Sequence, residues 1–256
     1  MHSTTEVRTE TIGSSLLITI DRPKARNAVN AAVATQLAAA IDQLEADPAL
    51  RAAVLTGAQG TFSAGMDLKA ALAGESPEIP GRGFGGLTRA QTTKPLIAAV
   101  EGWAMGGGFE LALGCDLIVA ADDARFGLPE VGRGLIAAGG GVIRLPKRLP
   151  YHLAMELLLT GEPVSGERAG QLGIANRVVA AGETVATALQ LAERIAQNAP
   201  LALAAVKNLV RAADGAPEEE AFAVQGRLMA ALAASADVRE GMTAFTERRS
   251  PVWQGR

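Results

Sequence analysis

The sequence predicts an α/β protein in which a mostly parallel sheet is followed by a region of helices. Four short apolar runs, at residues 16–20, 52–56, 96–100 and 116–120, have the length and composition of buried strands. Helical patterns lie between strands, an alternation that favours parallel pairing. From Tyr151 onward the pattern is almost entirely helical. With 256 residues, of which 48% are hydrophobic, the chain can form one large domain or one domain with a small appendage.

Local signals predict where the helices and loops lie. Asn30 is expected to cap a helix that runs to about residue 46, and Asp47-Pro48 ends it. The segment 73–86 is rich in glycine and proline and lacks periodicity, so we expect a mobile loop that shapes a pocket. Ser165 is expected to cap a short helix. The remaining expected elements are an extended piece at 176–180 and helices at 185–197, 201–213, 217–234 and 238–247.

Charge and composition argue against several classes of function. The formal net charge is −3 and the basic residues are scattered, so we expect no nucleic-acid partner, because phosphate binding needs a concentrated basic surface. The N-terminus is polar, and no apolar run reaches the roughly 18–20 residues that span a bilayer. We therefore expect a soluble, cytoplasmic protein without a membrane partner. The single cysteine, Cys115, rules out an internal disulfide and is expected to be buried and inert.

Other kinds of catalytic site lack support in the sequence. The only histidines are His2 and His152, there is no G-x-S-x-G motif, and no spacing suits a metal site. Residues 81–86 spell G-x-G-x-x-G, but prolines precede them where a dinucleotide-binding turn needs a strand, so a loop is predicted. Asp67 and Asp116 are expected to cap or pair locally rather than to catalyse.

Two segments favour chemistry next to a carbonyl group. Residues 62–69 (Phe-Ser-Ala-Gly-Met-Asp-Leu-Lys) and 106–111 (Gly-Gly-Gly-Phe-Glu-Leu) each join small residues to the expected start of a helix. Backbone N–H groups there have no intrahelical partner, so one from each segment can stabilise negative charge on an oxygen. Glu110 follows in an apolar stretch, and Glu130 follows a short strand-like segment. Two donors and two carboxyl groups suffice for acid–base catalysis beside a carbonyl.

With these motifs in this order, the chain resembles the enoyl-CoA hydratase/isomerase (crotonase) family over essentially its full length. The matching segments are 22–28 (Arg-Pro-Lys-Ala-Arg-Asn-Ala), 62–69, 97–111, 126–130 (Phe-Gly-Leu-Pro-Glu) and 245–253. The resemblance implies a crotonase-type spiral of β-β-α units with the acyl-CoA site at residues 1–195. It also implies a C-terminal helical trimerisation region at 196–256 and a homotrimer or hexamer. No dissociable cofactor is implied, because coenzyme A is part of the substrate.

The same resemblance assigns roles to individual residues. The backbone N–H groups of Met66 and Gly107 would form an oxyanion hole for the thioester carbonyl. Glu110 would hold and deprotonate a water molecule, and Glu130 would deliver a proton to the α-carbon. Glu130 must then be protonated, so we expect an apolar surround that raises its pKa. The implied substrate-binding residues are Lys24, Ala25, Ala64, Met66, Asp67, Leu68, Lys69, Gly107 and Ala138.

Two glutamates are the pattern of the family's hydratases, so the resemblance implies reversible syn addition of water to a trans-2-enoyl-CoA, as in fatty acid metabolism. Three alternatives stay open: a double-bond isomerase that uses Glu130 alone, a dehydratase for a carnitinyl-CoA-like substrate, and a non-catalytic acyl-CoA-binding scaffold. Ala137 and Ala138 stand where hydratases commonly carry Pro-Gly, which leaves the geometry of that turn open. The Ala138 N–H is still expected to help hold the water. Met66 replaces a commoner alanine and is expected to narrow the pocket.

Overall fold

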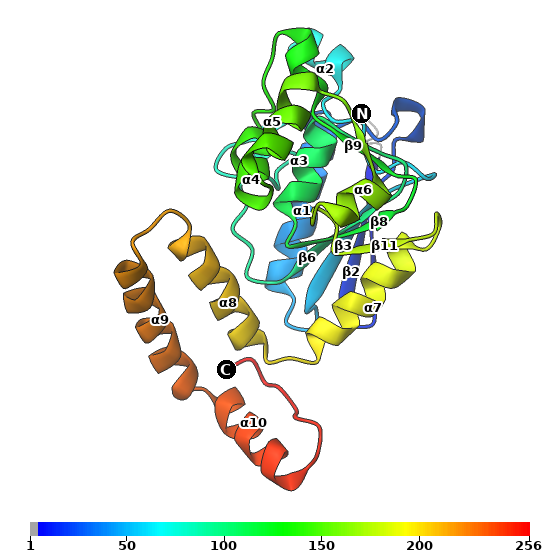
Figure 1. The fold of residues 1–256 in the computed structure, drawn as a ribbon. Helices are drawn as coiled ribbons and strands as arrows, with labels where there is room; N and C mark the ends of the chain where they lie inside the picture. The colour runs from blue at the N-terminus through cyan, green and yellow to red at the C-terminus, as the bar shows by residue number, and fades with distance from the viewer. Residues whose placement is uncertain (1–4) are drawn as a thin grey trace.

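The computed structural model describes residues 5–256 and shows an α/β core with a C-terminal arm of helices (Figure 1). The main sheet has six strands in the order β1-β2-β3-β6-β8-β11. They are β1 (Val7–Ile12), β2 (Ser15–Ile20), β3 (Ala52–Gly57), β6 (Leu96–Val100), β8 (Leu117–Ala121) and β11 (Arg177–Val179). Within this sheet, β2, β3, β6, β8 and β11 pair in parallel with their neighbours, and the β1–β2 pair is antiparallel. The predicted mostly parallel sheet is therefore confirmed.

Helices cover both faces of the main sheet. Successive side chains of a strand point to opposite faces. Leu55 and Ile118 belong to a large core with the helices α1 and α3, whereas Val54 and Val119 pack against α7 on the other face. These three helices are α1 (Ala31–Ala46), α3 (Gly107–Gly114) and α7 (Thr184–Ala196). Burial on both faces explains why the strands are visible in the sequence as continuous apolar runs.

A second, three-stranded sheet gives the chain its repeating β-β-α order. Its strands are β7 (Trp103–Met105), β9 (Arg125–Gly127) and β10 (Val164–Ser165). One unit runs β6-β7-α3, and the next runs β8-β9 into the 3₁₀ helix η2 (Pro129–Arg133) and α4 (Gly141–Arg148). In the unit before them β3 leads to Ser63, which bridges Ala104 of β7, and then to α2 (Leu68–Leu72). The repetition brings the residues that follow each second strand to one place.

The segment 73–86, predicted as a mobile loop, contains regular secondary structure. Residues of this segment form an antiparallel hairpin of β4 (Glu78–Ile79) and β5 (Gly83–Phe84), and Phe84 is only 5% exposed. Glycines at positive φ make the tight turns, and the aromatic ring joins the core. No helix opens after residue 86, so the rejection of a dinucleotide-binding turn is correct. Strand β1 was not predicted, because five of its six residues are exposed and its sequence shows little apolar alternation.

The local predictions agree with the structure. The Asn30 side chain accepts a hydrogen bond from the Val33 N–H at 2.9 Å and caps α1. Ser165 caps α6 (Gly166–Gln171) through the Arg168 N–H at 3.1 Å. Cys115 is buried, and burial raises the pKa of its thiol to about 12, so the thiol is inert as expected. His152 is exposed, whereas His2 lies outside the described residues.

The C-terminal part is helical, as predicted. Its elements are α5 (Tyr151–Thr160), α6, α7, α8 (Pro200–Ala213), α9 (Glu218–Ala233) and α10 (Ala236–Glu247), with β10 and β11 between. Helix α7, the last helix packed on the sheet, ends at Ala196, and the division expected at 195/196 stays a prediction. Helices α8 to α10 extend away from the core (Figure 1). The pattern did not predict α4, which contains Pro146.

Among the helices of residues 5–256, none combines the length and the apolar character needed to cross a bilayer.

Lys207 attaches α8 to the core through three hydrogen bonds. The Lys207 ammonium donates hydrogen bonds to Asp116 Oδ2 at 2.6 Å, to the Lys94 carbonyl at 2.7 Å and to Thr92 Oγ1 at 2.9 Å. Only 11% of the Lys207 side chain is exposed. Asp116 also accepts the Leu96 N–H at 2.8 Å. The local pairing expected for Asp116 is thus confirmed, and it joins the arm to the sheet.

We expect Asp116→Ala to lower the free energy of unfolding by about 3 kcal/mol, because it leaves the largely buried Lys207 ammonium without its counter-charge. Denaturant unfolding followed by circular dichroism measures the change. Asp214→Ala is the control: it removes the partner of the exposed Lys147, 2.7 Å away, and is expected to change stability by less than about 1 kcal/mol. Equal effects of the two substitutions would contradict this account.

Candidate active site

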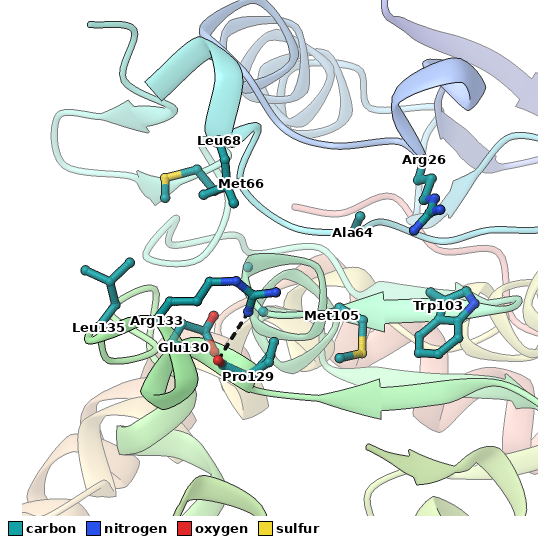
Figure 2. Close-up of a pocket in the computed structure, with 12 residues that line it drawn as sticks. Arg26, Ala64, Met66, Leu68, Trp103, Met105, Pro129, Glu130, Arg133 and Leu135 are labelled. Carbon is teal, nitrogen blue, oxygen red and sulfur yellow. Dashed lines mark hydrogen bonds between the residues drawn. The ribbon is translucent and has the colours of Figure 1, made fainter. Parts of the chain in front are cut away.

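A cavity of about 320 Å³ lies where the three β-β-α units meet. Its lining comes from residues 64–68, 103–107 and 129–135, together with Arg26 (Figure 2). Most of these side chains are apolar, and Glu130 supplies a carboxyl group. A mostly apolar cavity with a few polar groups is typical of a ligand site.

The cavity gathers part of the predicted site. Ala64, Met66, Leu68, Gly107 and Glu130 line it. The other predicted residues are outside its lining: Lys24 and Lys69 are exposed, Ala25 lies in the 3₁₀ helix η1 (Pro23–Ala25), and Asp67, Glu110 and Ala138 lie nearby along the chain. The Asp67 carboxylate caps α2 and forms an ion pair with Arg22 at 3.0 Å, as the local reading expected. Their roles toward a substrate stay predictions.

Two backbone N–H groups at the cavity are available to a ligand. Met66 pairs with Val29 in a parallel bridge: the Val29 N–H donates to Gly65, and the Asp67 N–H donates to Val29. In such a ladder the intervening residue directs its own N–H to the other side. Gly107 is the first residue of α3, so its N–H has no intrahelical acceptor. Within residues 5–256 neither N–H has a hydrogen-bond partner.

The two donor segments are in close contact. A Cβ atom on Gly65 would lie 2.9 Å from the Gly107 nitrogen, and Gly65 has a φ of +86°. A Cβ on Gly107 would overlap the ring of Phe84. Position 107 therefore requires glycine. Sequence reasoning missed Phe84, although a lone aromatic residue among glycines was an available signal.

Glu110 lies one turn into α3 and is only 3% exposed. Its Oε1 accepts the Gly141 N–H at 2.8 Å. Burial raises the pKa of Glu110 to about 7, and the charge of Glu130 adds to the rise. Hydrogen bonds from the backbone of Gly141 and Gly139 and the positive charge of Arg144 oppose it. The carboxyl group can thus change its protonation near neutral pH.

Glu130 lies at the start of η2, close to Gly106, the residue that precedes α3. A Cβ on Gly106 would lie 2.7 Å from Glu130 Oε1, which places this carboxyl beside the start of α3. Its Oε2 is buried and has no hydrogen-bond partner. Burial raises the pKa of Glu130, whereas its own backbone N–H and Arg133 lower it. The expected rise of this pKa is therefore found, and its cause is loss of hydration.

In the turn after Glu130, the backbone N–H groups that reach Glu110 belong to Gly139 and Gly141, and not to Ala138, whose N–H the sequence predicts to help hold the water. Gly139 and Gly141 approach the Glu110 carboxyl, and Gly140 has a φ of +115°, which favours glycine. Ala138 is exposed, and none of its described contacts reaches Glu110 or the cavity. The expected role of its N–H stays a prediction.

Several lining residues were not predicted as part of the site: Arg26, Trp103, Met105, Arg133 and Leu135. The first three lie inside the motifs at 22–28 and 97–111, so their neighbours were a usable signal. The last two follow Glu130 in a segment without periodicity, and Arg133 donates to the Pro129 carbonyl at 3.2 Å (Figure 2). Within residues 5–256, no group of three or more His, Cys, Asp and Glu side chains is arranged to hold a metal ion.

The arrangement can bind a carbonyl oxygen and move protons at neighbouring atoms. Two free N–H groups can stabilise negative charge on an oxygen, and two buried carboxyl groups can act as base and acid. Residues 10–256 match the enoyl-CoA hydratase/isomerase family. The chain belongs to this family.

Individual relatives agree with this assignment over nearly the whole chain. A carnitinyl-CoA dehydratase from Proteus mirabilis is 45% identical over 254 residues, covering 96% of this chain and 97% of its own length. The structure of an enoyl-CoA hydratase from Mycobacterium tuberculosis has a TM-score of 0.95 and 51% identity, covering 98% and 99% of the two chains. That of a carnitinyl-CoA hydratase from Mycobacterium avium has a TM-score of 0.78 and 46% identity, with the same coverage. The predicted crotonase fold is confirmed.

We expect Glu110→Gln to stabilise the protein increasingly as the pH rises. The folded-state pKa is about 7 against an ordinary 4.5, so the folded protein binds the proton more tightly than the unfolded chain. The wild type therefore loses stability between about pH 4.5 and pH 7, whereas glutamine does not titrate. The difference should grow to about 3 kcal/mol at pH 8, measured by denaturant unfolding at pH 5 and pH 8.

Glu240→Gln is the control for this measurement. Hydrogen bonds from Arg249 hold the pKa of Glu240 at about 2, against an ordinary 4.5, so it is ionised in the folded state and mostly ionised in the unfolded state from pH 5 upward. Its difference from the wild type should therefore change little between pH 5 and pH 8. A Glu110→Gln difference that is also constant would show that burial does not destabilise the Glu110 carboxylate.

Proposed function

We propose that this protein is an enoyl-CoA hydratase, a carbon–oxygen lyase that adds water to a trans-2-enoyl-CoA to give a 3-hydroxyacyl-CoA. The observation that carries this proposal is the pair of carboxyl groups, Glu110 and Glu130, beside the free N–H groups of Met66 and Gly107. Family membership supports an acyl-CoA thioester as the substrate. The reaction uses no dissociable cofactor, because all its steps are proton transfers and addition of water.

In the proposed mechanism the thioester oxygen accepts hydrogen bonds from Met66 and Gly107. Glu110 takes a proton from water as the water oxygen bonds to the β-carbon, and the electron pair of the double bond moves toward the carbonyl. The two N–H groups stabilise the resulting enolate oxygen. Glu130 then donates its proton to the α-carbon. Both carboxyl groups flank the start of α3, which supports addition to one face of the double bond.

The surroundings of the two carboxyl groups support these separate roles. Gly141 donates to Glu110, and Arg144 supplies positive charge, so both favour the ionised form that a base needs. The buried Oε2 of Glu130 has no donor to stabilise a negative charge, which favours the protonated form that an acid needs. The negative charge of an ionised Glu130 would raise the pKa of Glu110, so in the proposed mechanism Glu130 carries the proton while Glu110 is ionised.

A second candidate is a dehydratase for carnitinyl-CoA. Curated relatives with 45–46% identity, from Proteus mirabilis and Escherichia coli, are named carnitinyl-CoA dehydratase. Elimination of water is the reverse of the same steps and uses the same residues. An isomerase needs Glu130 alone, and a non-catalytic scaffold needs neither carboxyl. Burial of the Glu110 carboxyl costs free energy, and a backbone donor is arranged to bind it. A site of this kind is not needed by the isomerase or by the scaffold, which argues against both of these alternatives.

The test follows absorbance of the conjugated enoyl thioester with crotonyl-CoA, longer trans-2-enoyl-CoAs and carnitinyl-CoA. We expect hydration of an enoyl-CoA by the wild type, and a fall in kcat of at least about 100-fold in both Glu110→Gln and Glu130→Gln. Glu101→Gln is the control, because Glu101 binds the start of α7 at Thr184 and lies outside the cavity lining.

The other outcomes select the alternatives. Turnover of carnitinyl-CoA alone would replace the hydratase with the dehydratase. Double-bond migration that survives Glu110→Gln would favour the isomerase. Saturable binding of CoA esters by folded protein, with no turnover of any of them, would favour the scaffold.

We also propose that the chain forms a cytoplasmic homotrimer or a hexamer through its helical arm. No residue of α8 or α9 is fully buried, and several of their apolar side chains are exposed and can meet another copy. Large exposed apolar side chains of the arm are Val206, Val210, Phe222, Met229, Met242 and Phe245. Light scattering should give three or six times the 26.3 kDa of one chain. A mass of one chain would contradict the proposal.

A further inference from the structure

Arg144 of α4 lies behind the glycine turn that binds Glu110. Its guanidinium donates one hydrogen bond to the Gly139 carbonyl at 3.1 Å and another to the Thr88 carbonyl. A Cβ on Gly140 would overlap this guanidinium, so the turn and the side chain are packed in direct contact. Arg144 is partly buried, and such a position is costly for a cation without a specific partner.

The turn is held from two sides. On one side the Glu110 carboxyl accepts the Gly141 N–H at 2.8 Å, and a Cβ on Gly139 would lie 2.7 Å from Glu110 Oε2. On the other side Arg144 binds the Gly139 carbonyl. Because glycines offer no side chains to fix their own backbone, rotation of these peptide groups is opposed by the guanidinium together with the helix hydrogen bonds that the Gly140 carbonyl accepts.

The second acceptor of Arg144 lies in a segment that also borders the site. Thr88 follows the β4–β5 hairpin and is buried, and Phe84 of that hairpin packs on Gly107. Arg144 therefore joins the turn that orients Glu110 to the segment that packs on an oxyanion donor. Two carbonyl groups on separate segments suit the planar fork of a guanidinium better than a single ammonium group.

We propose that Arg144 is a positioning residue for the acid–base pair: it holds the 139–141 turn so that the Gly141 N–H meets and orients the Glu110 carboxyl. The catalytic part of this inference rests on the proposed function. Its electrostatic part does not, because Arg144 of α4 and Glu130 of η2 are the charged groups that act on Glu110 from neighbouring elements. Loss of the Arg144 charge should leave the negative charge of Glu130 unopposed by this cation. Glu110 should therefore be easier to protonate, which means that its pKa rises.

The kinetic test compares Arg144→Gln and Arg144→Lys with Arg148→Gln, each per amount of folded protein. Arg148 is the matched control: it lies one turn further along α4, donates to the Leu113 carbonyl at 2.8 Å, and has no described contact with the 139–141 turn. In Arg144→Gln we expect kcat to fall about 10- to 100-fold with little change in KM, because Met66 and Gly107 are untouched. Arg144→Lys keeps the charge and should recover only part of kcat.

A second readout does not depend on turnover. Carbon-13 labelling of glutamate carboxyl groups reports the protonation of Glu110 by NMR, with the signal assigned by its loss in Glu110→Gln. Arg144→Gln should raise the pKa of Glu110, and Arg148→Gln should leave it unchanged. Arg144→Lys, which retains the positive charge, should lie close to the wild type.

The outcomes separate this inference from the proposed function. If kcat is unchanged in Arg144→Gln, or falls equally in Arg148→Gln, the positioning role is overturned. If the Glu110 titration is the same in all three variants, the electrostatic part is overturned. If the wild type hydrates no enoyl-CoA and dehydrates no carnitinyl-CoA but Arg144→Gln still shifts the titration, the proposed function fails and the action of Arg144 on Glu110 stands.

Discussion

The hydrogen bond from the Gly141 N–H to the buried Glu110 carboxyl is the interaction on which the site depends. A carboxyl group that is removed from water is costly unless other dipoles replace its hydration. Here backbone donors replace it, and they reach the carboxyl because the residues at 139 and 141 have no side chains. The same turn begins α4 and so fixes Arg144 and the packing of that helix on α3.

The position of the two unpaired N–H groups proposed as oxyanion donors depends on the course of the backbone. The β-β-α repetition brings the segment after β3 against the segment after β7, and Met66 and Gly107 are among the residues that these segments contribute to the cavity lining. Main-chain N–H groups need no particular side chain, only a precise local conformation. That conformation is enforced by close packing at Gly65 and by the unpaired start of α3. The fold itself therefore sets the position of these two N–H groups.

Much of the fold was predictable because its signals are local. The strands of the sheet interior are continuous apolar runs, and Asn30 and Ser165 cap helices by contacts within three residues. Glu110 was recognisable because an acid in an apolar helix must be paired or functional. Phe84 and Arg144 were not, since their importance comes from contacts with Gly107 and Gly139, and Phe84 lies in a segment without periodicity. Strand β1 was not predicted, because an exposed edge strand shows no alternation of apolar and polar residues.

Because Phe84 packs directly on Gly107, the positions that line the cavity differ in which substitutions they tolerate. Any side chain at position 107 would displace the aromatic ring, so drift at either position is conditional on the other. Met66 and Leu135, in contrast, present side chains to the cavity without supplying a reacting group through them. Substitutions at such positions change the shape of the cavity without changing the backbone N–H groups of Met66 and Gly107. The size of the cavity and the position of its backbone donors can therefore vary separately.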